Sequence, residues 1–464
     1  MEDESKIDWK KLYFELLEGV AALKAEVAAL KAEIKELREK LSTNSNNSSK
    51  PPSQDPFRKP RTNQPSGKKP GGQPGHPGHT RKMYPPEQVT KTVNLQPDSC
   101  PHCGSSDFTE APISVECRQT VELPVLQPEV TQYNIYTCKC SECGRHVRPR
   151  IPNDAERGFG PRLMGFLTML SGEAGVTKRK ICSVSEHLGM KISLGALCNI
   201  HRIASDILED PFETIRRAVL ASKNVNADES SWRLKAKRCW LWIGATPTAT
   251  FFKIDPSRSR EAFHRIFGGY QNILSSDRYG AYNSHRGGKQ ACLAHILRDF
   301  NKMRERSGAD GVLGRILFGE LDLIFGLWKQ FKAQELDRPG LQTKAQNHIE
   351  NIKDALTITA SAEGMASKST ALCCDLLERF PTLWTFLHEE GVEPTNNLAE
   401  RGLRPAVIWR KVSGGSQSTW GLLFTERLQT VVYTLKQRSR NIFEFLAQSF
   451  EAHLHGTPGP PLPE

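Results

Sequence analysis

The sequence predicts a multidomain α+β protein, and three observations support that prediction. An apolar heptad runs through the first 43 residues, two Cys-x-x-Cys pairs follow a Pro- and Gly-rich stretch, and strand-like segments begin near residue 223. From these we expect, in chain order, a coiled coil, a zinc ribbon, a helical region and an α/β core interrupted by a helical insertion. At 464 residues the chain is long enough for these several domains.

The charge balance favours a polyanionic partner. The formal net charge is +11 and the pI is near 9.0, as in many proteins that bind nucleic acid. The N-terminus, MEDESKID, is acidic and lacks the apolar segment of a signal peptide, and the apolar runs are too short to span a membrane. We therefore expect a soluble cytoplasmic protein.

Residues 9–43 predict a coiled coil. Mostly β-branched residues at position a, with Leu at d, favour a parallel homodimer, although a trimer stays open. The alternative is one amphipathic helix packed on its own chain. Position a holds Val20, Val27, Ile34 and Leu41, and position d holds Leu16, Leu23, Leu30 and Leu37.

Residues 44–88 predict a basic, disordered linker. The segment is rich in Pro, Gly, Ser and Asn, which do not form a packed core. Residues 50–82 hold eight Lys or Arg against one acidic residue, so the linker is suited to neutralising DNA phosphates. The alternative is a solvated linker without a ligand. The expected nucleic-acid contacts here are Lys68, Lys69, Arg81 and Lys82.

Residues 89–155 predict a zinc-ribbon domain. The motifs CPHCG and CSECG each place two thiols at the spacing of a zinc knuckle, and four thiolates close a structural Zn²⁺ site. Cys138 falls outside that spacing, and the alternating segment between the motifs predicts strands. The alternative is a set of four buried free cysteines. The expected ligands are Cys100, Cys103, Cys140 and Cys143.

Residues 156–221 predict a helical region with the rhythm of a helix-turn-helix. A short helix is followed by the turn LGM, a cap at Ser193 and a second helix. Many helical hairpins share this pattern. Contact with DNA and a purely structural hairpin therefore remain equal alternatives.

Residues 222–300 predict the first part of a catalytic core. Three strands, a helix, a strand, a helix and a strand follow one another, which is the element order of an RNase H-like fold. In that fold a carboxylate on the first strand and one at the end of the fourth lie side by side, and Asp228 and Asp277 hold these places. Residues 301–392 predict a helical insertion, and the core resumes over 393–454 before a disordered tail at 455–464.

The segment PTNNLAERGLRP predicts a short helix on which Asn396, Asn397 and Glu400 share one face. With Asp228 and Asp277, Glu400 completes a set of carboxylates that can hold two Mg²⁺ ions, or Mn²⁺ in their place, roughly 3.5–4 Å apart. The alternative is a surface glutamate paired with arginine. The nearby cations expected to balance the site and grip DNA phosphates are Arg401, Arg404, Arg410 and Lys411.

These motifs resemble the DDE transposases of the insertion-sequence sixty-six group. The resemblance covers nearly the whole chain and rests on NSSKPPSQD, KKPGGQPGHPGH, the paired CPHCG and CSECG, NADESSW, SSDRYGAY, CLAHILRDF and TNNLAERGLRPAVIWRKVSGGSQS. It implies that Asp228, Asp277 and Glu400 form the catalytic triad. It also implies a bacterial, nucleoid-associated protein that acts on element ends and target DNA, with accessory proteins of the element as partners.

Two features near the triad need a separate interpretation. Glu229 follows Asp228, but strand alternation points it to the other face of the sheet, so we leave it out of the triad. Cys292 and His295 in CLAH lack a second ligand pair, which favours a buried structural role. The alternative places His295 near the active site.

The expected function is a DNA transposase that carries out Mg-dependent strand cleavage and strand transfer, and thus DNA recombination. A non-catalytic DNA-binding relative and an RNase H-like nuclease are the alternatives. The intact carboxylate motifs argue against the first alternative, and the nuclease reading leaves the coil, the basic linker and the insertion unexplained.

Overall fold

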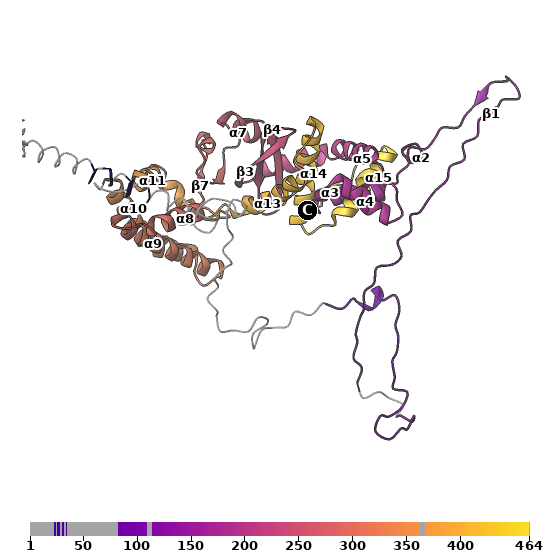
Figure 1. Cartoon of the computed structure of the whole chain (residues 1–464), viewed down its shortest axis with the longest axis horizontal. Helices are drawn as coiled ribbons and strands as arrows, with labels where there is room; N and C mark the ends of the chain where they lie inside the picture. Colours follow the sequence, from indigo (N-terminus) through magenta and orange to yellow (C-terminus); the bar gives the residue numbers. More distant parts are fainter. Residues whose placement is uncertain are drawn as a thin grey trace, which may run out of the picture. The chain divides into compact units, whose positions relative to one another are not determined.

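The computed structural model describes residues 82–108, 114–361 and 367–463, together with seven residues between 23 and 34. By its contacts the chain divides into two compact units, one comprising Phe57–Glu129 and the other comprising Met1–Pro56 with Val130–Glu464. Figure 1 shows the helices and the sheet of the larger unit. None of the described helices is long and apolar enough to cross a membrane.

A five-stranded mixed sheet lies in the larger unit. The strands β3, β4 and β5 form an antiparallel meander, whereas β6 and β7 run parallel to β3. The spatial order is β5-β4-β3-β6-β7, so β3 and β6 are neighbours, as the placement of the two aspartates predicts. The strand bounds are β3 Asn224–Leu234, β4 Lys237–Ala245, β5 Thr250–Asp255, β6 Ile273–Ser276 and β7 Lys289–Ala291.

One connection differs from the predicted element order. Helix α7 (Arg260–Phe267) joins β5 to β6 as predicted, but only the 3-10 turn η3 (Gly280–Ser284) lies between β6 and β7. The next α-helix, α8 (Leu293–Arg304), begins after β7. The segment between β6 and β7 is short and contains three glycines, which disfavour a helix.

The outer edge of β5 is closed by α14 (Thr419–Gln437). The backbone N–H of Phe252 donates to Thr430 Oγ1 at 2.9 Å, and that of Ile254 donates to Glu426 Oε1 at 2.7 Å. An open edge strand presents unpaired N–H groups to other chains. The polar side chains of α14 satisfy these donors and block the edge.

Helices before and after the sheet share one hydrophobic core with α7, α14 and one face of the meander. The predicted helical hairpin is present, and the Ser193 hydroxyl caps its second helix by accepting the Ala196 N–H at 3.1 Å. The bounds of these helices are α2 Asn153–Arg157, α3 Pro161–Gly172, α4 Lys178–His187, α5 Leu194–Ile207, α6 Glu209–Leu220 and α15 Ile442–His455.

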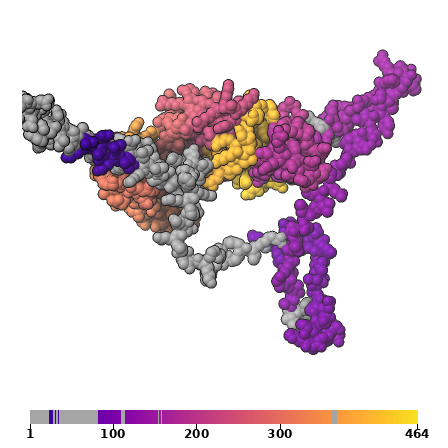
Figure 2. All heavy atoms as spheres, in the orientation of Figure 1, coloured from indigo at the N-terminus to yellow at the C-terminus, as the bar shows by residue number. Residues whose placement is uncertain are grey.

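The segment predicted as an insertion is helical, and its hydrophobic core also takes in α8, Ile273 of β6 and Ala291 of β7. Leu321, Trp328, Leu341 and Phe386 are among the side chains buried in it. Figure 2 shows these helices as the orange part of the larger unit. Their bounds are α9 Ala309–Lys332, α10 Arg338–Ser361, α11 Ser367–Glu378, η4 Phe380–Leu383 and α12 Thr385–His388.

Helix α13 (Asn397–Ser413) packs on β3 and β4 through Ala399, Leu403 and Ala406. At Gly402 a Cβ atom would come within 2.6 Å of Ile243 Cδ1, so glycine lets the helix approach the sheet closely. The helix is longer than the short one predicted, because it continues past Pro405. A proline inside a helix removes one backbone hydrogen bond, and the buried apolar face of α13 offsets that loss.

Two cysteine turns have the same local geometry. In the first, the Cys100 N–H donates to the Ser105 carbonyl at 2.8 Å and the Gly104 N–H donates to the Cys100 carbonyl at 2.8 Å. The second repeats this pattern at Cys140, and Gly104 and Gly144 both have positive φ, at 75° and 69°. The short strands β1 (Cys138–Lys139) and β2 (His146–Val147) flank the second turn, and η2 (Pro86–Gln88) precedes the first.

The strands predicted between the two cysteine turns do not form. Residues 114–137, all of which the structure describes, have no assigned strand, and Val115 and Val125 are 77% and 87% exposed. Alternating apolar residues favour an extended backbone, but a ladder also needs a partner strand and a covered face. The described part of this segment has neither.

Candidate active site

The first two predicted carboxylates lie on neighbouring strands. Asp228 is in the middle of β3, and Asp277 directly follows β6. The parallel register pairs Asn226 with Ser275, and two further residues along both strands bring Asp228 opposite Asp277. Sheet pairing therefore sets these two side chains next to each other, as predicted.

The third carboxylate approaches Asp228 from α13. Glu400 lies in the first turn of this helix, and α13 packs on the face of β3 to which Asp228 points. The pKa of Asp228 is raised well above its ordinary value, first by burial and then by the negative charges of Glu229, Asp277 and Glu400. The three predicted residues are thus close enough for their charges to act on one another.

The negative charge of the Asp228 carboxylate has few stabilising partners. Its Oδ1 accepts a hydrogen bond from the Glu229 backbone N–H at 2.8 Å. In the described part of the chain no cationic side chain pairs with it. A half-buried anion such as Asp228 without a countercharge costs free energy, and a bound cation would recover that cost.

Asn396 ties together the elements that carry the carboxylates. Its Nδ2 donates to the Ala227 carbonyl at 2.7 Å, and its Oδ1 accepts from Asn226 Nδ2 at 3.0 Å. Its backbone N–H donates to Cys292 Sγ at 3.2 Å. The residue before α13 is therefore bound to both β3 and the start of α8, which fixes Glu400 relative to Asp228.

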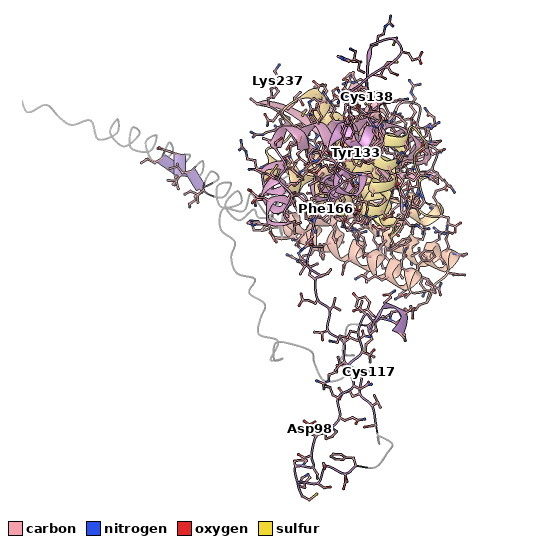
Figure 3. All side chains as sticks on the ribbon, turned by 90° about the vertical axis from the view of Figure 1, so that its right-hand side faces the viewer. Asp98, Cys117, Tyr133, Cys138, Phe166 and Lys237 are labelled. Atoms are coloured by element: carbon pink, nitrogen blue, oxygen red, sulfur yellow. The ribbon has the colours of Figure 1, made fainter. Side chains whose placement is uncertain are left out.

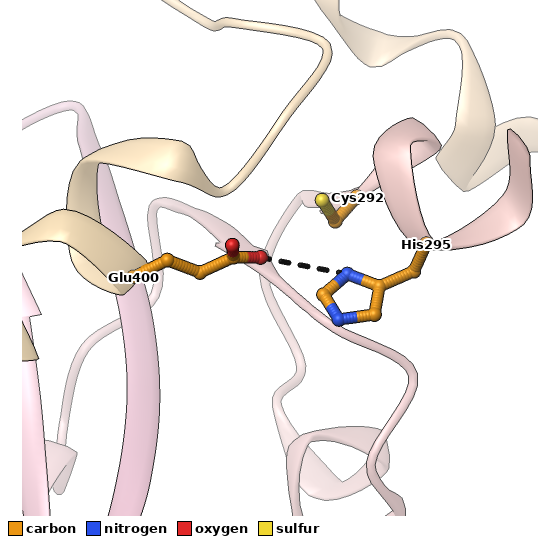
Figure 4. A group of neighbouring side chains, drawn as sticks. All are labelled: Cys292, His295 and Glu400. Atoms are coloured by element: carbon orange, nitrogen blue, oxygen red, sulfur yellow. Dashed lines mark ion pairs between the residues drawn. The ribbon is translucent and has the colours of Figure 1, made fainter. Parts of the chain in front are cut away.

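Cys292 and His295 lie beside Glu400 (Figure 4). His295 Nδ1 is 3.6 Å from Glu400 Oε1, and both atoms are buried without a hydrogen-bond partner in the described structure. The ligand atoms of all three residues lie within 4.8 Å of one another. Cys292 is buried, as the structural interpretation expects, whereas His295 occupies the place that the alternative gave it.

Two donor sets therefore meet at Glu400. The oxygen set of Asp228, Asp277 and Glu400 suits Mg²⁺ or Mn²⁺, and the orphaned Glu400 Oε1 fits a position that a cation would complete. The mixed set with Cys292 and His295 is typical of softer ions such as Zn²⁺. Burial raises the pKa of Cys292 to about 11, which disfavours the thiolate that such an ion needs.

The opposite face of β3 carries a different arrangement. Glu229 is buried there, as strand alternation predicts, and accepts hydrogen bonds from the Tyr282 hydroxyl and from the Arg258 guanidinium. Arg258 lies over the ring of Tyr279, with its Cζ 3.6 Å from the ring centroid. This network stabilises β3 on the face opposite Asp228. Its only sequence signals are that Glu229 adjoins Asp228 and that both tyrosines belong to SSDRYGAY.

The predicted DNA contacts are partly visible. On α13, Arg401, Arg404 and Lys411 are exposed, whereas Arg410 is half-buried. In the linker, Lys82 is exposed, and Lys68, Lys69 and Arg81 lie outside the described residues.

Each predicted zinc knuckle favours thiolate formation. The pKa of Cys100 is lowered by the backbone N–H groups of His102 and Cys103, and that of Cys140 by those of Cys143 and Glu142. The two turns belong to different compact units. Cys138, labelled in Figure 3, lies in β1 and not in the turn itself. The four-thiolate site remains a prediction.

Two curated relatives are uncharacterized proteins of Sinorhizobium fredii. The protein y4hP is 21% identical over 374 residues, which cover 71% of this chain and 66% of the relative. The protein y4qI is 21% identical over 253 residues, which cover 48% of this chain and 45% of the relative. The matched part thus spans less than two thirds of either relative.

Two family models match different parts of the chain. Residues 1–82 match a family of unknown function. Residues 158–423, more than half of the chain, match the model described as the transposase IS66 family, and this region includes the sheet, the helical insertion and all three carboxylates. The chain belongs to the IS66 family of transposases.

Proposed function

We propose that this protein is a DDE-type transposase that cleaves DNA at the ends of its mobile element and joins the freed strand to target DNA. The family gives the transposase role, and the influence of the Asp277 and Glu400 charges on Asp228, on the central strand of the sheet, supports the chemistry. The strand order β5-β4-β3-β6-β7, with an antiparallel meander and two parallel strands, supports an RNase H-like core.

The chain's own residues hold and orient the site. Asp228, Asp277 and Glu400 would hold divalent cations through oxygen atoms, and Mg²⁺, when bound, supplies activation of the attacking oxygen and stabilisation of the leaving oxygen at phosphorus. Asn396 keeps Glu400 in register with β3. His295 adds a polar group beside Glu400 that can contact the DNA or orient the carboxylate.

The remaining features serve binding and assembly in this proposal. The described heptad residues are helical and exposed, with Leu23 at 61% and Leu30 at 50%, so their apolar side chains are open to a second copy. Each cysteine turn would supply two thiolate ligands for structural Zn²⁺. The exposed cations of α13 would contact DNA phosphates near the carboxylates.

The test is cleavage of a plasmid that carries the gene's own flanking DNA, in Mg²⁺ or Mn²⁺. We expect the wild type to cut at the element's boundaries and leave 3′-OH ends. Asp228→Asn and Glu400→Gln should lower the rate by about a thousandfold or more, because metal catalysis supplies several kcal/mol. Asp322→Asn, an exposed acid on α9, is the matched control and should cut like the wild type.

The other outcomes separate the alternatives. Tight DNA binding without cutting by any of the proteins, with the element's accessory proteins added, would indicate a non-catalytic DNA-binding relative. Cutting without preference for the boundaries would indicate a nuclease. Equal cutting by the wild type and by both active-site variants would remove the carboxylates from the mechanism.

A further inference from the structure

The tip of the β3–β4 hairpin concentrates positive charge. Arg233, Lys235, Lys237 and Arg238 are all exposed there, and Arg233 lies directly opposite Arg238 in the antiparallel pair. Figure 3 shows Lys237 at the outer edge of the folded body. Like charges that face each other across two strands are destabilising. An anionic ligand would relieve this repulsion.

A third arginine joins the cross-strand pair from α13. Arg410 lies in the last turn of that helix, and its guanidinium donates to the backbone and hydroxyl oxygens of Ser231 on β3. Burial, followed by the charges of Arg233 and Arg238, lowers the pKa of Arg410. Across residues 82–108, 114–361 and 367–463, none of these three arginines has an acidic partner.

Backbone hydrogen bonds hold the hairpin that carries Arg233 and Arg238 against the turn after α13. The turn after α13 is joined to the hairpin by the Lys235 N–H, which donates to the Ser416 carbonyl at 2.8 Å, and by the Ser416 N–H, which donates to the Arg233 carbonyl at 2.9 Å. Gly415 has φ of +93°, and a Cβ there would lie 2.6 Å from the Arg233 carbonyl oxygen. Arg238 is held over the ring of Trp240, with its Cζ 4.5 Å from the ring centroid.

Arg233 lies on the same strand as Asp228 but on the other face of the sheet. It follows Asp228 by five residues, roughly 16 Å of strand, and this odd spacing places it on the face that carries Glu229. Arg238 lies over Trp240, whose ring also lies under Arg258, the partner of Glu229. A phosphate bound by these arginines therefore lies outside the site formed by the carboxylates.

We propose that Arg233, Arg238 and Arg410 form a binding site for a DNA backbone phosphate other than the phosphate that the carboxylates attack. This inference rests on the proposed function and extends it. Guanidinium groups bind phosphate through paired hydrogen bonds. Contacts of this kind carry no sequence information, and they fix the orientation of the protein on the duplex.

The first test measures the affinity of the full-length protein for a duplex of the gene's flanking DNA between 50 and 200 mM salt, conditions under which phosphate contacts dominate. Arg233→Gln should weaken binding several-fold and reduce the slope of log K against log salt by about 0.9. Lys344→Gln removes an equally exposed charge from α10 and should leave the slope unchanged. Both arginines of the cross-strand pair are exposed, so glutamine at either place should not disturb folding, which circular dichroism checks.

The second test locates the phosphate. Neutral methylphosphonates are placed one at a time along the duplex on either side of the mapped cleavage position. One of these substitutions, away from the cleaved phosphate, should weaken binding by the wild type and have no further effect on Arg233→Gln or Arg238→Gln. When the effects of the methylphosphonate and of the arginine substitution do not add, both changes remove the same contact. That position is then the phosphate that the arginines bind.

The outcomes distinguish this inference from the proposed function. A slope unchanged in Arg233→Gln, or methylphosphonate effects that simply add to those of the variants, would overturn the arginine site while cleavage by the wild type still stands. A reduced slope in a protein that binds but never cuts would support the phosphate site and remove the transposase chemistry. Failure of the wild type to bind any duplex DNA would overturn both.

Discussion

Asp228 and Glu229 are neighbours on β3, and the two faces of the sheet surround them differently. Glu229 accepts hydrogen bonds from Tyr282 and Arg258, which come from the same chain. Asp228 accepts one from the backbone N–H of Glu229 and otherwise meets negative charges. Burial alone therefore does not mark a functional carboxylate. The informative residue is the one whose countercharge the described chain does not supply.

The largest expected contrast between the two residues is in stability. Glu229→Gln leaves the Arg258 guanidinium beside a neutral amide, so we expect the free energy of unfolding to fall by about 2–4 kcal/mol. Asp228→Asn removes a half-buried charge that lacks a cationic partner, and it should not lower stability in metal-free buffer. Thermal unfolding of both variants, followed by circular dichroism, measures the difference. Equal losses in the two variants would contradict the comparison.

A second expected contrast is the response to Mg²⁺. Ligand binding to the folded state stabilises it by about 2.7 kcal/mol at a hundred times the dissociation constant. The melting temperature of the wild type should therefore rise with Mg²⁺ and return when EDTA removes the ion. This shift should vanish in Asp228→Asn and Glu400→Gln. Asp322→Asn is the control and should keep the Mg²⁺-induced rise in melting temperature. An equal rise in all four proteins would show that the ion binds at another site.

The sequence could predict the sheet and the neighbouring positions of Asp228 and Asp277, because both depend on local pattern. Apolar runs predicted the three-stranded meander. The positions of Asp228 and Asp277 within their strands predicted that the two residues lie next to each other. The alternation of β3 also assigned Glu229 to the other face. Glu400 was added from the pattern of its own motif, although a long helical segment separates it from both aspartates.

Other features could not be predicted because they depend on tertiary contacts. The expected strands between the cysteine turns had a suitable alternation, but the structure gives residues 114–137 no ladder partner. The clamp made by Asn396 requires β3, α8 and α13 to come together, and no spacing in the sequence reveals that. Arg258 likewise reaches Glu229 from a loop whose sequence carries no distinctive signal.

The smallest expected effect is a change of stability with pH. Burial, followed by the charges of Glu229, Asp277 and Glu400, raises the pKa of Asp228 in the folded protein well above its value of 3.8 in an unfolded chain. Between these two pKa values the folded protein keeps a proton that the unfolded chain has lost. The stability contributed by this group is therefore present at low pH and is lost as pH rises through the folded pKa.

In metal-free buffer, the advantage of Asp228→Asn over the wild type should thus be small near pH 4 and grow toward neutral pH. Each pKa unit corresponds to about 1.4 kcal/mol, and we expect a gain on the order of 1 kcal/mol. Melting temperatures of both proteins across this range measure it, and saturating Mg²⁺ should cancel the gain because the ion supplies the missing countercharge. If the two proteins keep a constant difference at every pH, Asp228 is already compensated, and the contrast with Glu229 fails.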